Sequence, residues 1–218
     1  MFFFNLKLVA LAATLSLTSL AASAQTFGEF LNKPELPLTF MGVDYSNAKY
    51  YGDPMTVSPA EMKGLFTKID ELLVKEAAKY DLQKALNRTT ATKYAIHYAE
   101  SANEKIDPGT IIVPVSSAPR AAFTAENIDR QITHYAYSAG GSGIGLVFVV
   151  EQIDKNSETE IFWATFVDLA TKKVLYTQKM QEKGAGFGFR NHWAGPLYGG
   201  IKQMKDDYGD WKKKLAKK

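Results

Sequence analysis

The sequence predicts an α/β or α+β fold: a mixed sheet of about five strands, with an antiparallel three-strand meander, packed by three main helices. Helical and strand-like hydrophobic patterns follow one another along the chain, and the last three strand patterns are joined by short polar turns. Of the 218 residues, 46% are hydrophobic and 22% are charged, as in an ordinary globular domain. One domain is therefore expected at this length.

Three amphipathic patterns predict the main helices. A helix over residues 59–80 begins with a capping box, in which Ser58 and Glu61 satisfy each other's backbone amides. A second helix follows Thr124, and the last one starts near Gly195. The apolar face of the last helix recurs every three or four positions, at Leu197, Ile201, Met204, Tyr208, Trp211 and Leu215.

Short apolar runs predict the strands. Residues 38–45 are mostly apolar and read as the first strand, and residues 144–153 are hydrophobic enough for a central strand buried on both faces. Residues 160–169 and 174–181 follow across short turns and complete the meander. In residues 92–100, tyrosines and an isoleucine alternate with other side chains, which favours a strand over the alternative of a helix.

Residues 1–24 have the features of a secretory signal peptide. Lys7 is their one charge, residues 8–20 are apolar or small, and Ala22 and Ala24 occupy the two positions that signal peptidase probes. The apolar run is short for a membrane span, although an uncleaved anchor helix is the alternative interpretation. An extended arm is expected over residues 25–37, which contain two prolines, and a single domain over residues 38–218.

The absence of cysteine narrows the options for an exported chain. It excludes disulfides, thiolate metal sites, a cysteine nucleophile and a lipidated cysteine anchor. A domain of this size can do without disulfides, so a bacterial periplasm is the expected location, with an extracellular one as the alternative. No later run of 18 apolar residues predicts an integral membrane span.

The charge of the chain is concentrated in its tail. After residue 24 the chain has 25 basic and 23 acidic residues, and without the tail lysines the acidic ones are in excess by three. No basic stripe predicts binding to nucleic acid. The tail is expected to make at most a weak contact with anionic lipid, through Lys212, Lys213, Lys214, Lys217 and Lys218.

Two segments are candidates for a ligand site. Asp44 and Tyr45 end the first strand, and strand ends are common ligand positions. A glycine-rich run over residues 184–188 leads to Arg190, which can grip an anion, and to His192, which can move a proton. In the alternative interpretation, Arg190 pairs with an acid such as Asp168. The candidate ligand-binding residues are Asp44, Tyr45, Arg190, Asn191, His192 and Trp193.

No pattern predicts catalysis, a metal or a cofactor. His97, His134 and His192 are far apart, and no Gly-x-Ser-x-Gly motif is present. The glycines at 140–145 follow a predicted helix and precede a strand, which is the reverse of a dinucleotide-binding loop. The sequence therefore leans away from an enzyme.

Three segments carry a resemblance to known proteins. GIGLVFVVEQIDK at 143–155, FVDLATKKVL at 166–175 and GFGFRNHWA at 186–194 resemble an uncharacterised family of secreted bacterial proteins. The strand and hairpin pattern is also similar to the amino-terminal domain of periplasmic TolB and related envelope lipoproteins. That similarity implies a sheet domain used for protein contacts and brings no catalytic residues. The chain differs from the lipoproteins because it has no cysteine for acylation.

These observations predict an exported, soluble module that binds another envelope protein. Its export signal, the lack of a catalytic constellation and the resemblance support this hypothesis. The alternative is a small-ligand-binding protein or an enzyme, with a pocket formed by Asp44 and residues 186–193.

Overall fold

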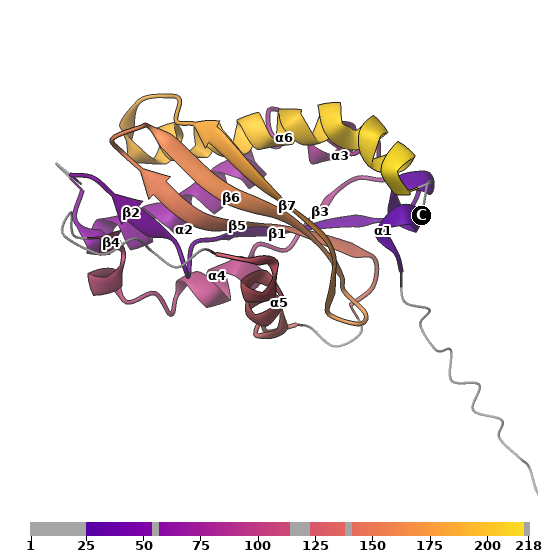
Figure 1. Ribbon diagram of the computed structural model, residues 1–218, viewed down its shortest axis with the longest axis horizontal. Helices are drawn as coiled ribbons and strands as arrows, with labels where there is room; N and C mark the ends of the chain where they lie inside the picture. The colour runs from indigo at the N-terminus through magenta and orange to yellow at the C-terminus, as the bar shows by residue number, and fades with distance from the viewer. Residues whose placement is uncertain (1–24, 54–56, 114–122, 138–140, 216–218) are drawn as a thin grey trace, which may run out of the picture.

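One sheet with helices on both faces makes up the fold (Figure 1). The computed structural model describes residues 25–53, 57–113, 123–137 and 141–215. The predicted signal peptide lies outside the described residues. Within the described residues, each helix is either too short or too polar to cross a bilayer.

The centre of the sheet is a set of parallel strands in the order β3-β1-β5-β2-β4. Both β1 and β2 pair with β5, β1 along its first half and β2 along its last three residues, so they follow each other along one edge of β5. On the other edge of β5, β6 and then β7 run antiparallel. The strands are β1 (Leu38–Asp44), β2 (Lys49–Tyr51), β3 (Lys93–Tyr94), β4 (Ile112–Val113), β5 (Ile144–Asp154), β6 (Thr159–Asp168) and β7 (Lys173–Lys183).

This architecture corrects the fold class expected from the sequence. The framework is a curled sheet built on five mutually parallel strands, not a sheet of about five strands organised by an antiparallel meander. The described residues also form six α-helices instead of three main ones. Three of the parallel strands have only two or three residues, too few to show a periodic pattern. Their pairing depends on crossovers through helices, which local patterns do not reveal.

The helices divide between the two faces of the sheet (Figure 1). One face is covered by α1, α2, α3 and α6 and contains the larger hydrophobic core, whereas α4 and α5 cover the smaller core on the other face. The helices are α1 (Phe27–Asn32), α2 (Pro59–Lys75), α3 (Leu82–Ala85), α4 (His97–Asn103), α5 (Ala125–Thr133) and α6 (Gly188–Leu215).

Three predicted elements have other boundaries or another type. The strand favoured for residues 92–100 is wrong over most of its length, because β3 has two residues and α4 begins at His97. The last helix starts at Gly188, so Pro196 lies inside it and does not begin it. The first long helix ends at Lys75, five residues before its predicted end.

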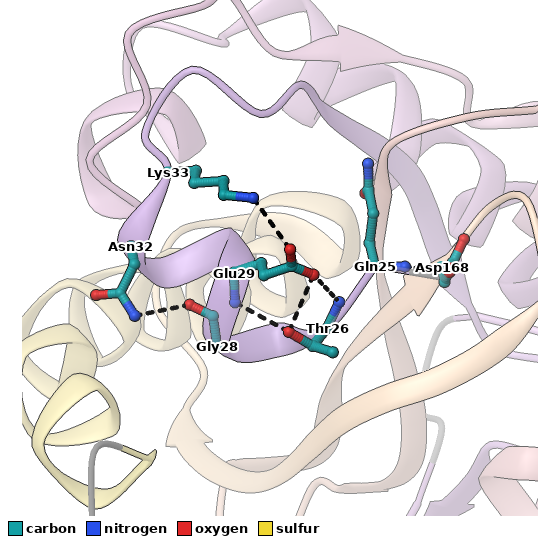
Figure 2. Close-up of polar contacts among 7 residues, drawn as sticks. All are labelled: Gln25, Thr26, Gly28, Glu29, Asn32, Lys33 and Asp168. Atoms are coloured by element: carbon teal, nitrogen blue, oxygen red, sulfur yellow. Dashed lines mark hydrogen bonds and ion pairs between the residues drawn. The ribbon is translucent and has the colours of Figure 1, made fainter. Parts of the chain in front are cut away.

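The predicted arm is also not extended, because it contains α1 (Figure 2). A capping box starts this helix: the Glu29 amide donates to the Thr26 hydroxyl over 3.1 Å, and the Thr26 amide donates to the Glu29 carboxylate. Arg88 holds the other end, since its guanidinium donates to the carbonyls of Phe30 and Lys33. The two prolines come after the helix, which is why they do not prevent it.

Candidate functional site

The row that β1 and β2 form along one edge of β5 is interrupted at Asp44. Four residues separate Asp44 from β2, although both strands pair with β5. A bulge just before the break shifts the register of β1, and Gly42 has a φ of +101° there. A side chain at Gly42 would come within 2.9 Å of the Ala99 Cβ. Both its positive φ and this close contact therefore favour glycine at this position.

Side chains from two helices take the place of a neighbouring strand along this part of β1. The paired residues of β3 reach only as far as Phe40. Beyond it, the Val43 amide donates to the Asp70 carboxyl over 2.7 Å. The Asn103 side chain accepts from the Tyr45 amide over 2.7 Å and donates to the Val43 carbonyl over 2.9 Å. The backbone at the break is therefore bonded although it has no strand partner.

Burial favours the neutral form of Asp70 in this role. It is fully buried, and burial raises the pKa of its carboxyl well above the ordinary value, although the bond from the Val43 amide opposes the shift. Its second oxygen has no hydrogen-bond partner among the described residues. Asp70 therefore serves to cap the strand edge from the helix side.

Asp44 links the strand end to α5. Its side chain is fully buried, and one carboxylate oxygen accepts the Ser46 amide over 2.7 Å. The other oxygen accepts the Tyr135 hydroxyl and the Gln131 amide. Gln131 also donates to the Ser46 hydroxyl over 3.0 Å and accepts from Asn47 over 2.7 Å. Burial and the Asp44 carboxylate raise the pKa of Tyr135, which keeps its hydroxyl a donor.

A pocket of about 460 Å³ opens beside this network, between α4 and α5, which lie on the same face of the sheet (Figure 1). Among the described residues that line it none is acidic, whereas three are basic: Lys105, Arg130 and His134. The imidazole Nδ1 of His134 bonds to the Arg130 carbonyl, which leaves Nε2 as its second polar atom. The lining residues are Ser46, Asn47, Ala102, Lys105, Phe123, Asn127, Arg130, Gln131, His134 and Tyr135.

Tyr45 does not share this site with Asp44. It is fully buried in the larger core, where its ring stacks on Phe66 with centroids 4.1 Å apart. Burial raises the pKa of Tyr45 well above its ordinary value, and the nearby Glu160 adds to the shift. Successive residues of a strand point to opposite faces, so Asp44 and Tyr45 lie on different sides of the sheet.

The glycine-rich segment is also separate from the pocket, since none of residues 186–193 lines it. Arg190 is exposed and its guanidinium donates to the Asn191 side chain over 3.0 and 3.1 Å, so it does not pair with Asp168. His192 lies 3.4 Å from the Gly186 carbonyl, and Trp193 is buried in the larger core. The structure therefore does not bring these residues together with Asp44.

The glycines around the start of α6 have a structural role. Pro196 has no amide to bond the His192 carbonyl, and the Ala185 amide donates to that carbonyl over 3.0 Å instead. Ala185 comes close because Gly195 has no side chain: a Cβ there would lie 2.7 Å from the Ala185 nitrogen. The glycines thus allow a hairpin end to close against the helix that follows it.

Comparison of the chain with protein-family models, curated proteins and solved structures finds no match. The resemblance to secreted bacterial proteins and to TolB stays a prediction. No group of three or more metal-ligating side chains occurs among the described residues. Sequence reasoning found Asp44 but missed Lys105, Asn103, Arg130 and Gln131, since single polar residues on helices carry no pattern.

Proposed function

We propose that the chain is an exported binding module that holds a small anionic molecule in the pocket between α4 and α5. The observation that carries the proposal is the charge of the pocket lining, which is basic at every ionisable side chain except the tyrosine. A concave surface with one sign of charge concentrates ligands of the other sign. Its volume of about 460 Å³ lies in the range of small-molecule sites.

The polar network beside the pocket supports binding and not chemistry. The Asp44 carboxylate already accepts three hydrogen bonds, and the Gln131 amide uses both its oxygen and its nitrogen within the network. These groups are held in place before a ligand arrives, which lowers the ordering cost of binding. They are also not free to act as a base or a nucleophile.

The exposed cationic side chains of Lys105 and Arg130 are available to bind a ligand. Lys105 and Arg130 are exposed and are not in the ion pairs found among the described residues. Glu126, one turn before Arg130 on α5, attracts the guanidinium from outside the pocket. A guanidinium on one helix and an ammonium beyond the end of the other suit a ligand with two anionic oxygen groups, which would bridge them.

A protein partner has less support on this surface. A protein-binding module is expected to expose a contiguous apolar patch of several hundred Å². Among the described residues, Phe187 is the one large hydrophobic side chain that is exposed, at 95%. A single side chain does not form such a patch, so binding of another envelope protein stays a prediction.

Calorimetric titration with citrate, and separately with inorganic phosphate, tests the anion pocket. We expect binding at low ionic strength, weakened about tenfold by Arg130→Gln or Lys105→Gln, since each removes one charge-assisted hydrogen bond. Arg190→Gln is the matched control because Arg190 is exposed but lies outside the pocket. Ala102→Phe should block the pocket sterically.

Two results would refute the proposal. One is the absence of heat with both anions, together with a neutral or cationic molecule retained by the natively purified protein in mass spectrometry. The other is equal loss of binding in the Arg190 and Arg130 variants, which would indicate a general charge effect.

A further inference from the structure

Asp168, at the end of β6, is a buried carboxylate without a basic side chain beside it. It is 1% exposed, and the ion pairs among the described residues do not include it. One of its oxygens accepts the amides of Ala170 and Thr171, over 2.8 and 3.3 Å, as in a turn cap. Lys173 faces it across the strand pair, but its side chain is exposed. A buried charge of this kind is costly without a cation.

The other oxygen of Asp168 accepts from the backbone nitrogen of Gln25 over 2.9 Å (Figure 2). The start of α1 fixes the position of Gln25. The capping box of α1 begins at Thr26, immediately after Gln25, and Phe27 is buried, with its ring stacked on Tyr176 at 4.4 Å. The Gln25 nitrogen is thus fixed at the carboxylate by the helix that it precedes.

Gln25 is also the residue that follows the predicted cleavage motif, Ala22-Ser23-Ala24. Hydrolysis of the bond between Ala24 and Gln25 by one water molecule leaves a carboxylate on Ala24 and an amine on Gln25. A free α-amino group is protonated at neutral pH. The atom that donates to Asp168 as an amide would then carry a positive charge.

We propose that Asp168 is the counter-ion of the α-ammonium group of Gln25 in the processed chain. Removal of the leader would then create an ion pair that fixes α1 to the end of β6. This inference is independent of the anion pocket, because Asp168 and Gln25 do not line it. It explains why a carboxylate without a basic side-chain partner is tolerated at a buried position.

The pairing has a chemical consequence at the same residue. An amino-terminal glutamine cyclises when its neutral amine attacks the side-chain amide carbon, forming a lactam and releasing ammonia. A protonated amine has no lone pair for this attack. Asp168 is therefore expected to slow the cyclisation of Gln25.

The test compares two chains, one starting at Gln25 and one retaining Ala24 before it. In urea unfolding at pH 6, we expect the chain that starts at Gln25 to have an unfolding constant about tenfold smaller, since its bond to Asp168 is charge-assisted. The difference should vanish at a pH at which the amine is neutral. Asp168→Asn should abolish it at pH 6.

Asp154→Asn is the matched control. Asp154 accepts two turn amides, those of Asn156 and Ser157, as Asp168 does, but it does not contact Gln25. Its substitution should destabilise both chains equally. Equal stability of the two chains at pH 6, or the same loss with Asp168→Asn in both, would overturn the inference.

A second measurement covers the case in which Asp168→Asn does not fold. Mass spectrometry follows the loss of ammonia from the chain that starts at Gln25, in buffer and in urea. We expect slower cyclisation in the folded protein at pH 6. Equal rates in both states would show that the amine is not held in its protonated form and would contradict the ion pair.

Discussion

Glu160 on β6 offers a sharp test of how the larger core is held together. Its side chain is fully buried, and neither carboxyl oxygen has a hydrogen-bond partner among the described residues. Burial raises the pKa of Glu160 well above its ordinary value, so the folded protein holds it as a neutral acid. Glu160→Gln replaces this acid by a neutral side chain of the same shape.

The sign and size of the effect follow from proton linkage. The unfolded chain releases the Glu160 proton near the ordinary glutamate pKa of 4.5, whereas the folded chain keeps it. The stability that the wild type owes to this proton is complete below that pH and falls as the pH rises toward the raised pKa. Each pH unit in this window costs about 1.4 kcal/mol of unfolding free energy. Relative to the wild type, Glu160→Gln should therefore gain up to that increment for each pH unit below the raised pKa.

Urea unfolding of both proteins at half-unit steps between pH 5 and 7 measures this difference directly. Burial raises the pKa of Asp70 as well, but Asp70 contributes equally to both proteins and cancels in the comparison. Glu158→Gln is the control on the same hairpin, because Glu158 is exposed and its ion pair with Lys155 lowers its pKa. A difference between Glu160→Gln and wild type that does not change with pH would refute the reasoning and show an ionised Glu160.

Three further substitutions test the site and its supports, each by urea unfolding. Asn103→Ala should cost about 2 to 4 kcal/mol, because it leaves the Tyr45 amide and the Val43 carbonyl unpaired, and a loss under 1 kcal/mol would contradict that capping role. Gly195→Ala should cost about 1 to 3 kcal/mol through overpacking, whereas Gly209→Ala in the same helix has open space and should stabilise. Tyr135→Phe should cost about 1 to 3 kcal/mol by removing a donor to Asp44, and equal stability would show that the bond contributes nothing.

Local signals in the sequence identified some elements well. Ser58 and Glu61 form the predicted capping box at the start of α2. The hydrophobic run at 144–153 is β5, the central strand, and it is buried along nearly its whole length. These features depend on neighbours in the chain, so the sequence contains the whole signal.

Local patterns in the sequence could not predict how distant strands pair. β3 and β4 have two residues each, and they pair because helices carry them back to the sheet. In residues 92–100, Tyr98 and Ala99 were assigned to a strand, yet they lie on α4 and pack under the sheet. Alternation and helical periodicity differ by little over so few residues, and tertiary contacts decide between them.

The candidate site shows the same division between local and distant information. Asp44 could be identified because it ends a strand, and ligand-binding residues are common at strand ends. Its partners Gln131, on α5, and Tyr135, just after it, come 87 and 91 positions later, and no spacing in the sequence connects them. Arg190, which the sequence grouped with Asp44, does not line this pocket, because residues around 190 form the start of α6, where Gly195 and Pro196 set how the chain closes.

The break between β1 and β2 explains how the fold forms the candidate site. If β1 continued into β2, a neighbouring strand could pair along the whole edge, and Asp44 would be one strand residue among others. The interruption turns the backbone away for four residues, and beyond the end of β3 Asp70 and Asn103 bond the Val43 and Tyr45 amides and the Val43 carbonyl. This arrangement lets Gln131 of α5 bond to Asp44 from the other face and leaves the pocket between α4 and α5. The buried polar network is therefore the structural condition for the pocket that we propose binds anions.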